Sequence, residues 1–375
     1  MPCQPHRPNP GGALSILRAL LVLLLLPAVP ALAQDAAQNP GGAADTEALP
    51  LVYVLATGGT IAGAGEPGAL TGYVSGEVPG DELVQAVPQI ERYARVVTEQ
   101  IVNVESSLIT AEIWLRLANR INELFHQTEP EVAGVVVTHG TWTLEETAYF
   151  LNLTVRSEKP VAVVGAQRPP SALSPDGPLN LLNAVRVVAD PTAKGHGVLV
   201  VMNEEINAAR EVSKGNTYRV EAFRSGELGF LGYVDADRVV FYRTPTKRHT
   251  LESEFDVRSL THLPRVGIVM SHTEATRLVV DAFVQEGYDG LILHGHGSGV
   301  ATPELREGLR DAARQIPVVR TAQAENSRVL DEPAWLEDGI MAGDNLGPLK
   351  ARILLRLALA HTRDPEELRR IFSQY

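Results

Sequence analysis

Seven short runs of apolar, mostly β-branched residues constrain how this 375-residue chain can fold. Each run is continuously apolar rather than alternating, which is typical of strands covered on both faces of a sheet. Elsewhere, apolar residues recur every three or four positions, as in amphipathic helices. This pattern predicts an α/β protein with mostly parallel sheets flanked by helices. The predicted strands are 51–55, 134–137, 161–164, 197–202, 266–270, 290–293 and 317–319, and helical spacing covers 113–125, 278–283 and 349–358.

A polar segment with weak periodicity and a proline near each end interrupts this pattern at residues 243–264. Such a composition break is typical of a linker between domains. It divides the chain into a larger N-terminal α/β domain, residues 48–242, and a smaller C-terminal α/β domain, residues 265–375. The chain is long enough for each domain to bury its own core.

The first 33 residues have the features of a secretory signal peptide. Arg7 and Arg18 precede a leucine-rich stretch at 19–26, and the segment ends in Ala-Leu-Ala. The apolar stretch is shorter than a membrane span, and two prolines interrupt the residues that follow it. We therefore expect a periplasmic protein with no membrane anchor after signal removal, and a flexible leader at residues 34–47.

Composition argues against several classes of partner and chemistry. The formal net charge is −12, and loss of Arg7 and Arg18 with the signal makes it more negative, so nucleic acid and anionic lipid are poor partners. The only cysteine, Cys3, lies in the predicted signal, which leaves no thiol chemistry in the mature chain. His294 and His296 lack a third ligand at a recognisable spacing, so no metal site is predicted.

Two threonine-bearing turns directly follow predicted strands. The first is Thr57-Gly58-Gly59-Thr60 and the second is His139-Gly140-Thr141-Trp142-Thr143. Ligands of open α/β sheets gather at such strand ends. The glycines allow a sharp turn and a close approach to a ligand, which makes Thr60 a candidate nucleophile. The alternative is that the glycines only close a turn. The Gly-Lys-Ser/Thr ending of a nucleotide-binding loop is missing, which argues against a nucleotide.

The second turn leads into a predicted helix. Thr143 and Glu146 form a capping-box pattern, so Thr141 and Trp142 precede a helix N-terminus, whose partial positive charge suits a carboxylate or an oxyanion. The Thr141 hydroxyl can equally be satisfied within its own turn. Lys214 lies in a polar loop typical of surface charges, although a buried lysine with a lowered pKa can deprotonate a threonine.

Several sequence blocks, present in order, strongly resemble the L-asparaginase family, and specifically its bacterial type II branch of periplasmic asparaginases and glutaminase-asparaginases. The resemblance implies a two-domain asparaginase-like fold. It also implies hydrolysis of the side-chain amide of L-asparagine, or of L-glutamine or a related amide, through a threonine acyl-enzyme and without a metal or organic cofactor. Besides the two turns, the blocks are 145–151, 164–169, 174–181, 243–245 and 371–375.

The resemblance also implies roles for individual residues. Thr60 matches the family's nucleophile, and Tyr73 matches the mobile-loop tyrosine beside it. Thr141 and Lys214 match the second threonine and its lysine partner. Ser106 matches the serine that helps to hold the carboxylate of the substrate. The resemblance therefore implies four catalytic residues, Thr60, Tyr73, Thr141 and Lys214.

An acidic residue reaches the family's active site from a neighbouring subunit, and Glu332 is the candidate here, which implies a homotetramer. The chain departs from the family's His-Gly-Thr-Asp-Thr signature at Trp142, and from the usual glycine-serine segment at Glu105-Ser106-Ser107. Ser107 and Trp142 complete the candidate substrate-binding residues. An indole donates a hydrogen bond but accepts none, so Trp142 cannot neutralise the substrate's ammonium group as an aspartate does.

Two hypotheses follow from this departure. In the first, the protein is an asparaginase-like amidohydrolase with weakened or shifted activity. In the second, it is a periplasmic ligand-binding protein or pseudoenzyme that lost turnover through Trp142. We favour the enzyme because Thr60, Tyr73, Thr141 and Lys214 are all retained. The sequence does not rank asparagine against glutamine, since the two differ by one methylene.

Overall fold

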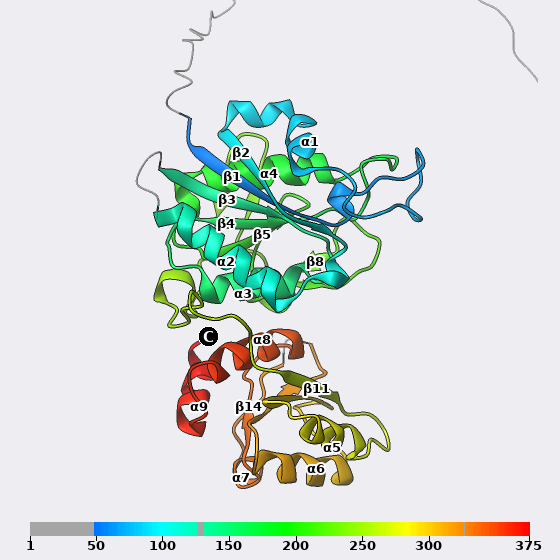
Figure 1. The fold of residues 1–375 in the computed structure, drawn as a ribbon, viewed down its shortest axis with the longest axis vertical. Coiled ribbons are helices and arrows are strands. Elements are labelled where there is room, and N and C mark those ends of the chain that lie inside the picture. Colours follow the sequence, from blue (N-terminus) through cyan, green and yellow to red (C-terminus); the bar gives the residue numbers. More distant parts are fainter. Residues whose placement is uncertain (1–48, 127–130, 326) are drawn as a thin grey trace, which may run out of the picture. The chain divides into compact units, whose positions relative to one another are not determined.

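The computed structural model describes residues 49–126, 131–325 and 327–375, which form one compact unit. The predicted signal peptide and leader lie outside the described residues. Two main sheets and one two-stranded ribbon carry the fold (Figure 1). Within the described residues, no helix combines the length and the apolarity that a membrane span requires.

The larger sheet has eight strands in the order β10-β9-β6-β5-β4-β3-β1-β2. Five neighbouring strands, β2, β1, β3, β4 and β5, pair in parallel. β6, β9 and β10 extend the sheet beyond β5 in antiparallel pairing. The bounds are β1 Leu51–Gly58, β2 Arg95–Val104, β3 Val132–Thr138, β4 Val161–Val164, β5 Val198–Met202, β6 Glu205–Ala208, β9 Gly232–Val234 and β10 Val239–Phe241.

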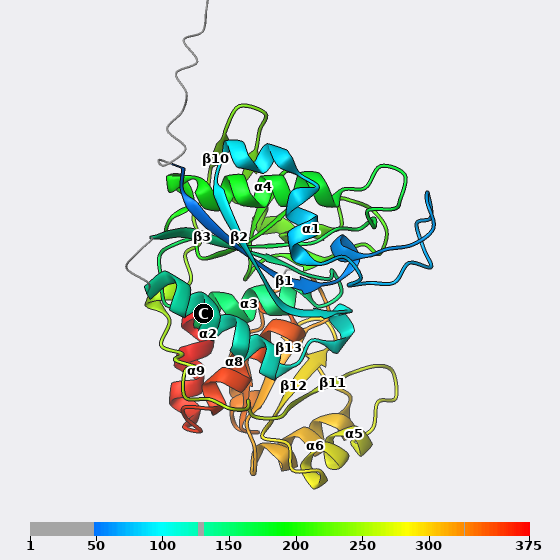
Figure 2. The same cartoon turned by 45° about the horizontal axis from the view of Figure 1, so that its top comes forward.

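Helices cover both faces of this sheet (Figures 1 and 2). On one face lie α1 (Gly80–Gln85) and α4 (Gly177–Ala189), and on the other lie α2 (Ala111–His126) and α3 (Leu144–Thr154). Alternate residues of β1 serve the two cores: Val52 and Val54 pack under α1 and α4, whereas Leu55 packs under α2 and α3. Both faces of the strand are therefore apolar, which explains its continuous apolar run.

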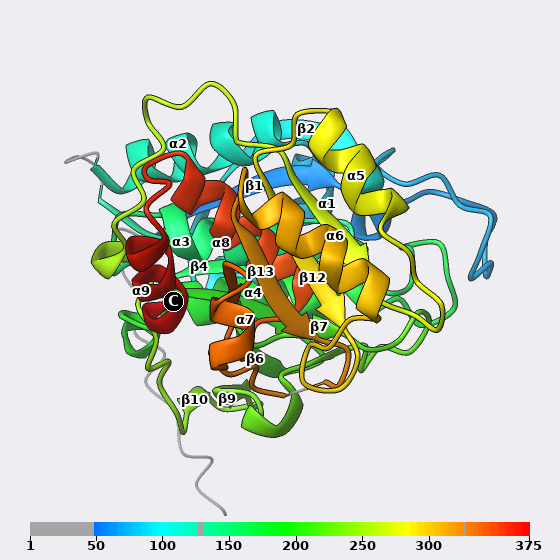
Figure 3. The same cartoon turned by 90° about the horizontal axis from the view of Figure 1, so that it is seen from below.

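The smaller sheet contains four parallel strands in the order β11-β12-β13-β14. Figure 3 shows α5 and α6 beside this sheet, and α8 packs against its other face and against α3 of the larger domain. The bounds are β11 Val266–Met270, β12 Gly290–Gly295, β13 Val318–Ala322, β14 Ile340–Ala342, α5 Leu278–Gln285, α6 Pro303–Ala313, α7 Pro333–Leu336, α8 Pro348–Leu359 and α9 Pro365–Gln374. The predicted fold class, two α/β domains with mostly parallel sheets, is confirmed.

Short elements complete the chain. The ribbon pairs β7 (Ser213–Lys214) with β8 (Phe223–Arg224) and so carries one of the candidate catalytic residues. The 3-10 helices are η2 Thr60–Ala62, η3 Pro88–Arg92, η4 Ser106–Leu108, η5 Pro191–Ala193, η6 Gly226–Leu228 and η7 Thr250–Glu252. Two of them, η2 and η4, begin at candidate site residues.

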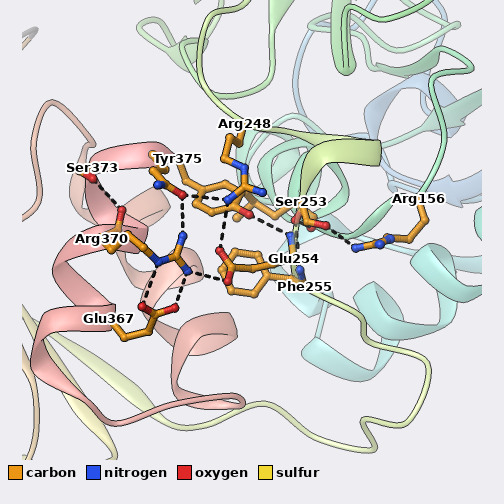
Figure 4. A network of polar contacts seen from close by, with 11 residues as sticks. Arg156, Arg248, Ser253, Glu254, Phe255, Glu367, Arg370, Ser373 and Tyr375 are labelled. Carbon is orange, nitrogen blue, oxygen red and sulfur yellow. Dashed lines mark hydrogen bonds and ion pairs between the residues drawn. The ribbon is translucent and has the colours of Figure 1, made fainter.

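The segment between the two sheets is held by the C-terminal helix (Figure 4). The Tyr375 side chain is fully buried, its ring centroid lies 5.1 Å from that of Phe255, and its hydroxyl accepts a hydrogen bond of 2.9 Å from the Glu254 N–H. Arg370 on α9 pairs with Glu254, and Arg156 of the larger domain donates to the Ser253 carbonyl. The connection between the domains is therefore packed rather than free. The exact domain boundaries stay predictions.

Candidate active site

The strand order places both threonine turns at a topological switch point. β1 lies between β2 and β3, so the chain passes from β1 to one neighbour and then crosses to the other. In an open parallel sheet this divergence leaves a crevice at the carboxyl ends of the strands. Thr60 follows the end of β1 and Thr141 follows the end of β3. The connectivity of the sheet thus determines where the site lies.

Two glycines bring the turns into direct contact. Gly59 has a φ of +84°, and a Cβ built on it would lie 2.2 Å from the Cα of Gly140. A Cβ built on Gly140 would in turn lie 2.7 Å from the Oγ of Ser106. No side chain fits at either position, because backbone fills the space beside Gly59 and the Ser106 side chain fills the space beside Gly140. Both glycines line one cavity that the two turns share.

That cavity opens to solvent and is lined by Gly59, Thr60, Ser75, Glu105, Ser106, Gly140, Thr141 and Trp142. Thr60, Ser106 and Thr141 are buried, whereas Trp142 is 61% exposed. Four of the eight predicted site residues therefore line the same cavity. Ser107 is exposed and does not line it.

Tyr73 reaches the site through the Thr60 hydroxyl. The Oγ1 of Thr60 and the Oη of Tyr73 are 2.8 Å apart, and either atom can be the donor. The phenol ring lies beside Gly63 and the Cβ of Tyr73 lies beside Gly65; an added Cβ on either glycine would lie 2.9 Å from Tyr73. The two small residues thus make room for the ring beside Thr60.

Lys214 reaches the site through the second threonine. Its Nζ donates a hydrogen bond of 2.7 Å to the Oγ1 of Thr141. Burial lowers the pKa of the Lys214 ammonium, and the nearby carboxylate of Glu145 acts in the opposite direction. Glu145 also accepts a hydrogen bond of 3.4 Å from the Lys214 main-chain N–H. A lowered pKa increases the fraction of neutral amine, the form that can accept a proton from a hydroxyl.

The smaller domain anchors the segment that carries Lys214. Lys350 on α8 is buried, and its Nζ donates to the carbonyls of Arg210, at 2.8 Å, and Val212. Burial lowers the pKa of Lys350 to about 8. The Arg210 guanidinium donates to the side chain of Asn345 and to the main-chain oxygen of Tyr375. The position of Lys214 therefore depends on both domains.

A buried chain of hydrogen bonds supports the second turn. The Trp114 indole N–H donates to Thr147 at 2.8 Å, the Thr147 hydroxyl is 2.8 Å from Nε2 of His139, and Nδ1 of His139 is 2.7 Å from the Gly140 carbonyl. Burial lowers the pKa of His139 to about 4, so its ring is neutral at pH 7. Because the carbonyl only accepts, Nδ1 carries the proton and Nε2 accepts from Thr147. This series of hydrogen bonds orients Gly140.

The predicted capping box does not form. α3 begins at Leu144 as expected, but the Thr143 side chain makes no capping hydrogen bond. Its hydroxyl donates instead to the Ser106 carbonyl at 2.7 Å, and the Glu146 carboxylate lies 3.8 Å from Arg352. The prediction was wrong because a tertiary partner competes with the local backbone for the Thr143 hydroxyl. This hydrogen bond links the second turn directly to η4.

Glu332 lies at the N-cap of α7, where its carboxylate is 3.6 Å from the Arg320 guanidinium. Among the residues that the structure describes, no hydrogen bond or ion pair joins Glu332 to the cavity. A role across a subunit contact stays a prediction.

Two parts of the chain match models of one protein family. Residues 51–247 match the family described as asparaginase, N-terminal, and residues 265–372 match the glutaminase/asparaginase C-terminal domain. The chain belongs to the asparaginase family. The expected membership of the bacterial L-asparaginase and glutaminase-asparaginase family is confirmed by its relatives.

Three proteins illustrate the asparaginase relationship. The chain is 43% identical over 332 residues to L-asparaginase 2 of Escherichia coli, covering 88% of this chain and 94% of the relative. It is 40% identical to the glutaminase-asparaginase of Pseudomonas fluorescens, covering 95% and 97%. The solved structure of a probable cytoplasmic L-asparaginase from Campylobacter jejuni superposes with a TM-score of 0.84 at 41% identity, covering 87% of this chain and all of that one. The two-domain asparaginase fold is thereby confirmed.

Three residues of the site were not among the predicted site residues. Glu105 and Ser75 line the cavity, and Glu145 neighbours Lys214. Glu105 could have been found from the sequence, because this position departs from the glycine of the usual glycine-serine segment. Ser75 and Glu145 carry no comparable local signal, because only the fold brings them to the threonines.

Proposed function

We propose that this protein hydrolyses the side-chain amide of L-asparagine, and of L-glutamine or a related amide, to the acid and ammonia. The observation that carries the proposal is that two buried threonines line one cavity, each hydrogen-bonded to a group able to move a proton. The names of its relatives as L-asparaginases and glutaminase-asparaginases support this reaction. They give no support to the alternative of a binding protein or pseudoenzyme.

In the proposed reaction, the Thr60 oxygen attacks the amide carbon and Tyr73 hydrogen-bonds to that oxygen. Backbone N–H groups near the start of α3 stabilise the oxyanion, because a helix N-terminus carries partial positive charge. The proton of the Thr60 hydroxyl passes through Tyr73 to the amide nitrogen, the carbon–nitrogen bond breaks, and ammonia leaves while the acyl group stays on Thr60. Water activated by the Thr141–Lys214 pair then hydrolyses the ester and restores the Thr60 hydroxyl.

Ser106, Ser107 and Trp142 are proposed to contact the substrate outside its amide. Ser106 supports this role best, because its side chain is buried at the cavity wall and receives a hydrogen bond of 3.3 Å from the Trp142 main-chain N–H. We further propose a periplasmic homotetramer with Glu332 at a subunit contact. A relative named as a probable periplasmic L-asparaginase, from Haemophilus influenzae, supports the location; it is 41% identical.

Ammonia release from purified mature protein tests the function. L-asparagine or L-glutamine should give ammonia, and Thr60→Ala should lower kcat by more than ~1,000-fold because it removes the nucleophile. The matched control is Thr246→Ala, which makes the same change at an exposed threonine and should leave kcat unaltered. A folded wild-type protein that releases no ammonia from either amide contradicts the proposed function.

A further inference from the structure

One charged side chain stands out at the active-site cavity. Among the cavity-lining residues that the structure describes, only Glu105 carries a formal charge. The other lining residues are two threonines, two serines, two glycines and Trp142. Glu105 therefore brings the one formal charge to the cavity that Thr60 and Thr141 also line.

Glu105 is held in place from both sides. The residue before it, Val104, pairs with Gly58 and accepts a hydrogen bond of 3.0 Å from the Gly59 N–H. The residue after it, Ser106, contacts Gly140 and accepts from the Trp142 main-chain N–H. Glu105 is thus fixed between the two threonine turns by its chain neighbours, in an extended conformation with φ −65° and ψ 142°. Its position relative to the nucleophile does not depend on a flexible loop.

The Glu105 carboxylate is available to a ligand. It is partly buried, and within the described part of the chain no hydrogen bond or ion pair engages it. A carboxylate in such a place favours a cationic partner, because charge-assisted hydrogen bonds are about twice as strong as neutral ones. The exposed Trp142 indole lines the same cavity, and the face of an indole also attracts cations. Both features select for positive charge.

We propose that Glu105 binds the α-ammonium group of the amino-acid amide substrate, with the Trp142 indole beside it. The proposal rests on the proposed function, since it concerns the same cavity and the same substrate. It explains how a chain with tryptophan at position 142 can still recognise an ammonium group, because the carboxylate comes instead from the residue that follows β2. Glu105 is then a substrate-binding residue that selects amides with a free amine.

Glu105→Gln tests this directly, with L-asparagine and with succinamic acid, the same molecule without its amino group. Loss of the carboxylate should raise KM for L-asparagine at least tenfold with little change in kcat. It should leave kcat/KM for succinamic acid unchanged or higher. Glu112→Gln, the same change at an exposed position on α2 outside the cavity, is the matched control and should behave as wild type.

The outcomes separate the two proposals. A wild type that releases ammonia from neither L-asparagine nor L-glutamine overturns the proposed function. A wild type that hydrolyses L-asparagine with a KM unaffected by Glu105→Gln overturns the role of Glu105 alone. An increase in kcat/KM for L-asparagine also overturns it, because Glu105 would then repel the substrate carboxylate.

A measurement on the wild type keeps the test independent of variant folding. 3-Aminopropanamide carries the amide and the ammonium group, whereas propanamide carries only the amide. As competitive inhibitors of L-asparagine hydrolysis, the first should show an inhibition constant at least tenfold lower than the second. Equal inhibition constants overturn the proposal. In the Glu105→Gln background, Trp142→Asp should recover the KM for L-asparagine by returning a carboxylate to the same cavity.

Discussion

The Lys214 side chain illustrates how single residues set the chemistry of this site. Two opposing effects act on its pKa: burial lowers it and the Glu145 carboxylate raises it, with burial the larger. Lys214 contacts Thr141 at 2.7 Å, so its protonation state determines whether that hydroxyl can lose a proton. If the neutral amine is the active form, kcat/KM rises as pH increases through the lowered pKa of Lys214.

Glu145→Gln should move this rise in kcat/KM to lower pH. Loss of the carboxylate removes the interaction that favours the protonated amine, so the pKa of Lys214 falls further and the neutral form appears at lower pH. The glutamine oxygen can still accept from the Lys214 N–H. Profiles of kcat/KM against pH check this, with the exposed Glu123→Gln as control. A move of the rise to higher pH contradicts it.

At the scale of elements, the contact between the turns after β1 and β3 assembles the site. Gly59 and Gly140 meet backbone to backbone, and the hydrogen-bonded chain through His139 supports the second turn from behind. A side chain at Gly59 has to displace backbone rather than a flexible side chain. The geometry between Thr60 and Thr141 is therefore sensitive to a single methyl group.

Gly59→Ala should lower kcat/KM at least tenfold, because its Cβ would lie 2.2 Å from the Cα of Gly140 and force the turns apart. Gly68→Ala is a matched control, since Gly68 has the same φ of +84° but no atom within 4 Å of an added Cβ. Both variants place alanine at the same positive φ, and only the first meets backbone. Steady-state kinetics on the two proteins check this, and equal activities would show that the turn contact is not needed.

At the scale of the whole described chain, the smaller domain contributes to the site without lining it. Lys350 on α8 and the main-chain oxygen of Tyr375 hold the segment at 210–212, next to Lys214. The packed connection around Tyr375 joins α9 to the same region. Amide hydrolysis is thus expected to depend on docking of the two domains.

Lys350→Met should lower both stability and activity. Two buried carbonyls lose their donor, at a cost of ~1–3 kcal/mol each in unfolding free energy, and the freed segment should lower kcat/KM at least tenfold. Lys194→Met changes an exposed lysine in the same way and should stay within ~0.5 kcal/mol of wild type. Denaturant unfolding and kinetics measure the two effects. Full activity in Lys350→Met would show that the anchor does not position Lys214.

The strands that were predicted and those that were missed differ in burial. The seven apolar runs correspond to seven strands, because burial on both faces leaves a continuous apolar pattern. These strands are β1, β3, β4, β5, β11, β12 and β13. β2 was not predicted, since it is an edge strand with Arg95, Glu99 and Asn103 among its residues. β6, β9, β10 and β14 were also missed. Each is three or four residues long and includes a residue that is only partly buried, whereas β4, equally short, is buried throughout.

By itself, the sequence determined the α/β class, the position of each threonine turn after a strand, and the family to which the chain belongs. These are properties of local patterns, which depend on side-chain period and on ordered motifs. The tertiary structure alone decided that Gly59 meets Gly140, that Thr143 bonds to Ser106, and that Lys214 is partly buried beside Glu145. Those contacts join residues far apart along the chain, and burial, hydrogen bonding and pKa depend on such neighbours.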